Sequence, residues 1–466
     1  MSGPHPYALR CARAVGGRAC SGAGCPPTPS PGPPILYTGG GIGPQMDELP
    51  ALLDGDPRLL RAVKEEVARR RLCDSCLGRQ LGKVDHAANA ERGELMRRSA
   101  DPAAVPLPPA ECVLCEGLVE EYDAIAAEAM RALAGVEWSS FMVGCRATER
   151  IARTESELAK SIHTPWAEAL KTEVNREVGR RVELATGGEV DLETPDVTVL
   201  VDPEFNTVEL QVRSVFVYGR YTKLVRDIPQ TRWPCRRCRG RGCPECQGTG
   251  KQYLTSVEEI IAAPFMEALG GGEHALHGAG REDIDARMLG RGRPFVVEIR
   301  DPKRREWDPV EMERRVNAAA PDKVQVTSLR PSTKSEVVRL KGSTYEKTYR
   351  ITFTVQGGID LPRLEEASRQ LAGAMIKQRT PSRVSHRRAD LERLRRVARF
   401  SLVEAFGDRA IVEVRGESGI YVKELIHGDR GRTQPSLSGL LGTPCDVVEL
   451  DVLEVHDSTP RGGEER

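Results

Sequence analysis

The stretch PCRRCRGRGCPECQGTGK, from Pro234 to Lys251, constrains the local fold of this 466-residue chain more tightly than any other. Two Cys-x-x-Cys pairs stand four residues apart within it, so four thiolates can surround one tetrahedral metal ion. Its four glycines allow the loop to fold back on itself. The spacing therefore predicts a compact zinc knuckle, and the metal ligands are Cys235, Cys238, Cys243 and Cys246.

Three other interpretations of this stretch are another state of the four cysteines, a phosphate-binding loop and a chaperone zinc finger. Four cysteine ligands do not choose the metal, so an iron–sulfur cluster and unliganded reduced cysteines both remain alternatives to zinc. A phosphate-binding Walker loop is excluded, because Glu245 stands where the first glycine is needed and Gln252 follows Lys251. The zinc fingers of J-type co-chaperones share the phrase Cys-x-x-Cys-x-Gly-x-Gly, but this chain lacks the His-Pro-Asp triplet of a J domain. A chaperone finger is therefore the weaker interpretation.

A second set of paired cysteines lies in the N-terminal half. Cys73 and Cys76 form one pair and Cys112 and Cys115 another, with the separation of a zinc ribbon built from two halves. Eight of the 13 cysteines thus stand in Cys-x-x-Cys pairs, and an odd total does not suit a disulfide framework. We expect a reducing, cytoplasmic compartment with structural Zn²⁺ at both sites.

Charge is balanced overall but clustered locally. The chain has 68 basic and 68 acidic residues, and no apolar run long enough to span a membrane. Residues 220–251 and residues 377–399 each hold nine Lys or Arg against two Asp or Glu. A charge run is usually a solvated face, but two such runs in a neutral chain favour a nucleic-acid partner. Tyr218, Tyr221 and Trp233 lie in or beside the first run, where they either stack on bases or anchor the loop.

The periodicity of the chain predicts an α+β fold. Strands are indicated at 196–202 and 207–219 and a helix over 167–186, and the C-terminal half alternates further strands and helices without a regular βαβ order. That pattern favours mixed, largely antiparallel sheets. Residues 1–45 are low in complexity and predict a disordered extension.

The stretch HGAGREDIDARMLGRGRPF, from His277 to Phe295, is bounded by glycines and rich in charge. The interpretation without any catalytic role is a charged turn between two strands. The frame Gly-Arg-Glu-Asp at 280–283 instead resembles the catalytic loop of pseudouridine synthases, in which one aspartate performs the chemistry. Together with RYTKLVRDIPQTRWPC, KTYRITF, QRTPSRVSHRRADL and GIYVKELIHGDRGRTQPSLSGLLG, it closely resembles the archaeal tRNA pseudouridine synthases of the Pus-ten family, over roughly residues 47–455.

The resemblance implies roles for particular residues. Asp283 matches the catalytic aspartate, with Asp285 as its rival. Tyr349 matches the tyrosine that stacks on the target base, and Lys423 the basic partner of the carboxylate. The remaining substrate-binding assignments are Tyr421 as a substrate contact, Leu450 as the apolar residue beneath the pocket, and Arg281 as a further cation near the carboxylate.

The implied function is isomerisation of uridine 54, uridine 55 or both in the TΨC arm of tRNA, by an aspartate acting on a flipped base. This reaction oxidises nothing and transfers no group to a second molecule, so no organic cofactor is expected. The expected partner is tRNA, with no membrane and no obligatory protein partner. A non-catalytic zinc-dependent RNA-binding protein or RNA chaperone is the alternative, and a methyltransferase bearing a THUMP domain is a third.

The expected organisation has five parts. They are a disordered extension (1–45), a zinc-binding and THUMP-containing RNA-binding module (46–218), a basic zinc-knuckle connector (219–254), a pseudouridine synthase catalytic domain (255–456) and a flexible tail (457–466).

Overall fold

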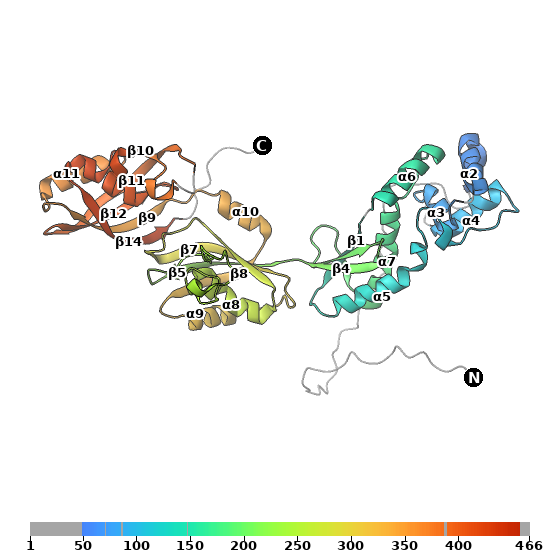
Figure 1. Cartoon of the computed structure of the whole chain (residues 1–466), viewed down its shortest axis with the longest axis horizontal. Coiled ribbons are helices and arrows are strands. Elements are labelled where there is room, and N and C mark those ends of the chain that lie inside the picture. The colour runs from blue at the N-terminus through green and yellow to red at the C-terminus, as the bar shows by residue number, and fades with distance from the viewer. Residues whose placement is uncertain (1–48, 70, 85–86, 147, 386–388, 457–466) are drawn as a thin grey trace, which may run out of the picture.

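The computed structural model consists of two bodies joined by a narrow waist (Figure 1). It describes residues 49–69, 71–84, 87–146, 148–385 and 389–456. The expected disordered extension and flexible tail lie outside these residues. Among the described helices, none combines the length and the apolar composition that crossing a bilayer requires.

The first part of the N-terminal body is a small helical unit. Asp56 caps its second helix, because its carboxylate accepts hydrogen bonds from the backbone N–H groups of Arg58 and Leu59 at 3.0 and 3.1 Å. Leu59, Val63 and Val67 then recur at helical spacing on the buried face. The helices are α1 (Leu49–Gly55), α2 (Pro57–Arg69), α3 (Asp74–Gly78) and α4 (Asn89–Ala100).

A four-stranded sheet and three helices complete the N-terminal body. The strand order is β2-β1-β3-β4, with β1 parallel to both β2 and β3, and β4 antiparallel to β3. Residues in β3 alternate between buried and half-buried, because α7 and α5 cover one face of the sheet. The elements are α5 (Tyr122–Leu133), β1 (Ser140–Cys145), α6 (Glu149–Ile162), α7 (Leu170–Thr186), β2 (Glu189–Val190), β3 (Val197–Asp202) and β4 (Thr207–Val212).

The single strand expected over 207–219 is in fact two strands in different bodies. β4 ends at Val212, and β5 (Val215–Lys223) joins the C-terminal sheet between β7 and β8. The break falls at Arg213, whose backbone N–H bonds to the Asp196 carbonyl at 2.8 Å and whose side chain also turns back to Asp196. Alternating apolar residues on both sides of the break conceal it in the sequence.

The C-terminal body is built on one ten-stranded sheet, in the order β13-β10-β11-β12-β9-β14-β7-β5-β8, with β6 paired to β7. Its pairings are antiparallel except between β7 and β14. The predicted α+β class with a mixed, largely antiparallel sheet is therefore confirmed. The strands not yet given are β6 (Glu273–Gly278), β7 (Ala286–Arg300), β8 (Val324–Ser332), β9 (Lys347–Val355), β10 (Met375–Arg379), β11 (Glu392–Phe406), β12 (Arg409–Gly416), β13 (Thr433–Gln434) and β14 (Cys445–Val455).

Helices divide this body into two packed halves. One hydrophobic cluster lies between the sheet and the helices α8 (Val257–Leu269), α9 (Pro309–Ala319) and α10 (Lys334–Gly342). The other lies beneath α11 (Leu361–Leu371), α12 (Val422–His427) and α13 (Leu437–Leu441). Tyr349 packs against both clusters, so it marks the junction of the halves. The parallel pairing of β14 with β7 lies at the same junction, because it joins Leu450 to Ala286 in one cluster and Val452 to Met288 in the other.

Candidate active site and metal centres

The loop that carries the predicted aspartate connects β6 to β7 and turns sharply at Gly280. That residue has φ of +82°, a conformation that L side chains rarely adopt. A Cβ there would also lie 3.3 Å from the Arg293 Nη1 and 3.6 Å from the Lys347 Cε. Gly280 is therefore required both for its backbone geometry and for the space that the two cations fill.

Beneath the loop lies a buried ion pair. The Glu282 carboxylate and the Arg293 guanidinium are 2.9 Å apart, with side chains 0% and 1% exposed. The Tyr221 hydroxyl lies 2.9 Å from both Glu282 oxygens, and Gln230 donates to that hydroxyl at 2.8 Å. Arg293 also donates to the Ala279 carbonyl at 2.8 Å. Burial, reinforced by the Glu282 charge, raises the pKa of Tyr221 well above its usual value, so this hydroxyl stays a donor.

Asp283 follows directly and turns the other way, toward the surface. Its side chain is 35% exposed and lies between two cations. The Arg383 Nη1 lies 3.4 Å away and the Lys423 Nζ 3.5 Å away. Both cations are within ion-pair distance of the carboxylate.

Each of the two cations has a second partner. Lys423 is closer to Asp285, at 2.7 and 2.9 Å. Burial would raise the pKa of Asp285, but the hydrogen bond from Lys423 lowers it. Arg383 donates to Glu424 at 2.7 Å, and the Glu424 side chain is only 2% exposed. The buried Glu424 carboxylate therefore holds the Arg383 side chain beside the loop that carries Asp283.

The predicted aromatic and apolar residues surround this cluster. Tyr349 comes from β9; burial raises its pKa to about 12, and the charge of Asp283 adds to that shift while Arg293 opposes it. Leu450 on β14 is 5% exposed beneath the loop, opposite Ala286. Tyr421 is half-buried at the start of α12, and the Gln378 side chain bonds both its N–H and its carbonyl, each at 2.9 Å. This grip fixes the first turn of α12, which carries Lys423.

The structure brings Asp283, Tyr349, Lys423 and Leu450 together and orients Arg281 differently. The Arg281 Cζ stands 5.0 Å over the Trp233 ring, a cation–π contact with the base of the knuckle. The cation that approaches Asp283 in addition to Lys423 is instead Arg383.

Sequence reasoning missed Arg383, Glu424 and Glu282. Arg383 belongs to the basic run at 377–399, where nothing in the spacing separates it from eight other cations. The only available signal for Glu282 was its place inside the Gly-Arg-Glu-Asp frame.

The knuckle cysteines form a metal-binding set. Their Sγ atoms all lie within 4.8 Å of one another, and the Cys243–Cys246 distance is 3.7 Å. The backbone N–H groups of Gly242 and Gly250 point at Cys238 and Cys246, each at 3.2 Å, which suits thiolate acceptors. The donor set thus fits a tetrahedral Zn²⁺ held by Cys235, Cys238, Cys243 and Cys246.

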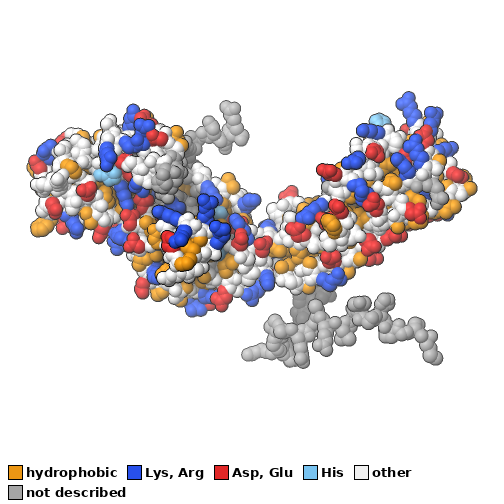
Figure 2. All heavy atoms as spheres, viewed as in Figure 1, with side chains coloured by type: hydrophobic (Ala, Val, Ile, Leu, Met, Phe, Trp, Pro, Cys, Tyr) orange, Lys and Arg blue, Asp and Glu red, His pale blue; other side chains and the backbone are white. Residues whose placement is uncertain are grey.

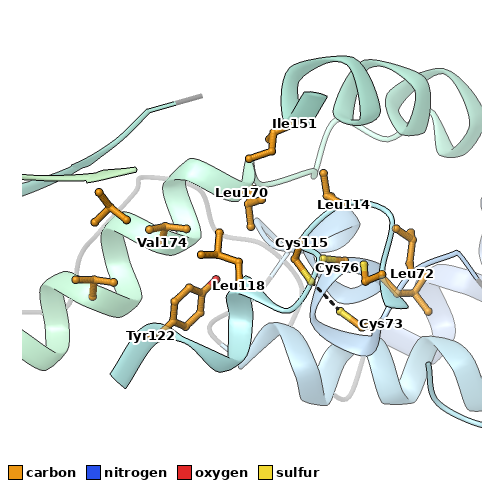
Figure 3. Close-up of a cluster of buried hydrophobic side chains, with 14 of the residues drawn as sticks. Leu72, Cys73, Cys76, Leu114, Cys115, Leu118, Tyr122, Ile151, Leu170 and Val174 are labelled. Atoms are coloured by element: carbon orange, nitrogen blue, oxygen red, sulfur yellow. Dashed lines mark hydrogen bonds between the residues drawn. The ribbon is translucent and has the colours of Figure 1, made fainter. Parts of the chain in front are cut away.

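The second set is buried in the N-terminal body (Figure 3). Cys73, Cys76, Cys112 and Cys115 also have Sγ atoms within 4.8 Å of one another, and all four are buried. The fully buried Arg79 donates to the Cys76 Sγ at 3.0 Å and to Glu173 at 2.6 Å. A Zn²⁺ with four thiolates carries a net charge of −2, so a buried arginine beside it is the counter-charge that such a site needs.

A surface hollow of about 410 Å³ lies elsewhere on the C-terminal body. It is lined by residues between His427 and Pro444. None of Asp283, Tyr349 and Lys423 lines it, so it lies apart from the cluster described above.

Two family models match this chain. The model described as "Pus10, C-terminal" matches residues 216–456, and "Pus10 THUMP domain, archaeal" matches residues 125–202. Curated relatives named "tRNA pseudouridine synthase Pus10" are similar over most of their length. The relative from Halorubrum lacusprofundi is 42% identical, covering 82% of this chain and 93% of its own. The one from Methanopyrus kandleri is 41% identical, covering 86% and 99%.

A more distant curated relative bears the same name. That of Methanocaldococcus jannaschii is 36% identical, covering 86% of this chain and 96% of its own. Among solved structures, "Crystal Structure of a Cbf5-Nop10-Gar1 Complex" is similar at 16% identity over 43% of this chain and 45% of that chain, with a TM-score of 0.28.

We predict that Glu282→Gln lowers the free energy of unfolding by about 3–5 kcal/mol, because it leaves the Arg293 charge buried and unpaired. The loosened loop should also lower the turnover rate on RNA by about tenfold with KM unchanged. Thermal unfolding and steady-state kinetics measure the two effects. Glu273→Gln, which breaks an exposed pair with Arg300, is the matched control and should change neither. A rise in KM at constant turnover would contradict a positioning role.

Elemental analysis of the purified chain should give two zinc ions per molecule. Replacing Cys243 and Cys246 by serine should remove one, and replacing Cys73 and Cys76 should remove the other. A metal content near zero, or the visible absorption of an iron–sulfur cluster, would contradict the assignment.

Proposed function

Because this chain belongs to the Pus10 family, we propose that it isomerises uridine 54, uridine 55 or both in the TΨC arm of tRNA, with Asp283 as the acting carboxylate. The chain is a tRNA pseudouridine synthase, an isomerase, and its substrate is tRNA. The observation that supports the finer assignment is the position of Asp283 between Arg383 and Lys423 and close to Tyr349.

The reaction breaks the C1′–N1 bond of uridine and forms a C1′–C5 bond, while the proton on C5 is exchanged for one on N1. No electron is gained or lost and no second reactant enters. An ionised Asp283 acts by attack at C1′, by attack at C6 or by assisting glycal formation, and each route needs a charged, fixed carboxylate. Arg383 and Lys423 supply the charge balance, and the Glu282–Arg293 pair fixes the backbone that carries it.

The target base must leave its stack, which costs a few kcal/mol. Stacking on Tyr349, at about 1–3 kcal/mol per base, offsets part of this cost. Asp283 is one-third exposed in the free chain, so the flipped nucleoside itself closes the site and displaces water from the carboxylate. Leu450 then forms part of the apolar floor.

Zinc takes no part in this chemistry. When bound at the knuckle it would hold a short basic loop against the C-terminal body, where Trp233 meets Arg281 of the catalytic loop. The knuckle arginines are suited to phosphate contacts, which confer affinity without reading sequence.

The experiment that tests the function maps pseudouridine in an unmodified tRNA transcript after treatment with the wild-type chain and with Asp283→Asn. The variant should lose at least about 10³-fold in turnover. Its affinity for tRNA should stay within about tenfold, because phosphate contacts supply most of the binding energy. Asp446→Asn, at an exposed position on the same body, is the matched control.

The rival carboxylate is tested in the same assay. Asp285→Asn should retain measurable activity, since Asp285 holds Lys423 rather than the base. Full activity of Asp283→Asn together with loss in Asp285→Asn would reverse the assignment. Full activity in both variants would assign the chemistry to another residue, whereas absence of pseudouridine after treatment with the wild-type chain would favour a non-catalytic RNA-binding protein.

Arg383→Gln should lower turnover by about 10–100-fold, because one of the two cations beside Asp283 is lost. The change alone also strands the buried Glu424, so the double variant Arg383→Gln/Glu424→Gln, which removes both charges, separates the effects. We expect the double variant to recover thermal stability and not turnover. Recovery of both would show that Arg383 serves the fold and not the reaction.

A further inference from the structure

The two bodies meet at a narrow waist (Figure 2), and a small set of charged groups joins them there. From the C-terminal body, the loop 301–308 between β7 and α9 reaches across to the N-terminal body. The Lys303 carbonyl accepts a hydrogen bond from the Glu137 N–H at 2.8 Å, and the Arg305 N–H donates to the Glu137 carboxylate at 2.5 Å. Main-chain groups of the loop thus bind both the backbone and the side chain of Glu137 in the N-terminal body.

The Arg305 side chain completes the joint. Its Nε lies 3.1 Å from the Asp196 carboxylate and its Nη1 donates to the Arg213 carbonyl at 2.7 Å. Asp196 also accepts from the Arg213 guanidinium at 2.6 Å and from Ser139 at 2.8 and 3.0 Å. With 9% of its side chain exposed, Asp196 is a nearly buried acceptor shared by both bodies and the connecting chain.

The loop is fixed to the C-terminal body, so its contacts with the N-terminal body can set how the two bodies are oriented. The backbone N–H groups of Lys303 and Arg304 both bond to the Leu269 carbonyl at the end of α8, at 2.8 and 2.9 Å. Trp307 packs edge-on against Phe265 of α8, with ring centroids 5.4 Å apart. Three groups of the loop are therefore tied to α8, while Arg305 contacts the N-terminal body.

Charge keeps the joint closed at neutral pH. Burial would raise the pKa of Asp196, but its hydrogen bonds, that of Arg213 first among them, hold it at about 2. The two-residue backbone link at 213–214 is a flexible connection on its own. An ionised carboxylate held by two arginines in a partly buried site makes the connection between the bodies far stiffer. A waist this narrow would otherwise allow the bodies to swing.

We propose that this joint, made by Arg305 with Asp196 and Glu137, sets the angle between the two bodies and thereby selects which uridine of a bound tRNA reaches Asp283. The inference rests on the proposed function. A rigid tRNA that contacts both bodies can present only those nucleotides that the fixed angle permits. A loose joint admits neighbouring uridines and lowers the effective concentration of the correct one.

The test uses the full chain and two RNAs, an unmodified tRNA transcript and a stem-loop holding the TΨC arm alone. Arg305→Gln should lower kcat/KM on the transcript by about tenfold and on the stem-loop by less than about twofold. It should also raise the share of pseudouridine formed at other uridines of the transcript. Arg314→Gln, which removes an equal charge from an exposed pair with Glu311 on the same body, should do neither.

Small-angle scattering of the free chains gives a second measurement. Arg305→Gln should broaden the distribution of distances within the molecule, while Arg314→Gln matches the wild type. Arg305→Lys, which keeps the charge but cannot reach two acceptors, should give an intermediate result and guards against simple misfolding. Equal losses on both RNAs, or no loss on the transcript, would overturn the proposal.

Failure of the two proposals can be told apart. If the wild-type chain forms no pseudouridine in either RNA, the proposed function fails. Small-angle scattering then tests separately whether Arg305 fixes the angle between the bodies. Identical scattering profiles of Arg305→Gln and the wild type would overturn the proposed joint.

Discussion

The buried pair of Glu282 and Arg293 is the interaction on which the site depends. Two charges that water cannot reach are costly unless each finds the other in good geometry, so the pair tolerates little movement. Glu282 is held in the interior, and the next residue, Asp283, lies at the surface with 35% of its side chain exposed. Asp283 therefore projects from a fixed backbone toward Arg383 and Lys423. Tyr221 and Gln230 extend the same network to the segment that enters the knuckle.

The position of the site follows from how the sheet is assembled. Two halves, each with its own helices and hydrophobic cluster, meet where β14 runs parallel to β7. A carboxylate loop from one half, a lysine helix from the other and a tyrosine at the junction converge there. Two cations stand beside the carboxylate, and apolar side chains of both clusters meet at the junction. The two cysteine clusters lie outside this region.

Much of this could be predicted from sequence. The two cysteine sets were confirmed as spatial clusters, because four thiolates at such spacing have few other arrangements. The α+β class followed from the order of elements, and the cap at Asp56 from its place before a proline and an apolar period. The family resemblance supplied Asp283, Tyr349, Lys423 and Leu450, and the fold brings these four together.

The sequence by itself determined the local elements and the two cysteine clusters, and it singled out Asp283 as the candidate carboxylate, since each depends on neighbours along the chain or on a short frame. The tertiary structure alone decided which cations lie beside the Asp283 carboxylate. Arg383 stands 100 residues from Asp283, and Arg281, two residues away, stacks on Trp233 instead. It alone also split the strand at Arg213 and placed Arg305 against Asp196. Ion pairs between distant residues depend on how sheets and loops pack, and a list of charges along a chain contains no record of that packing.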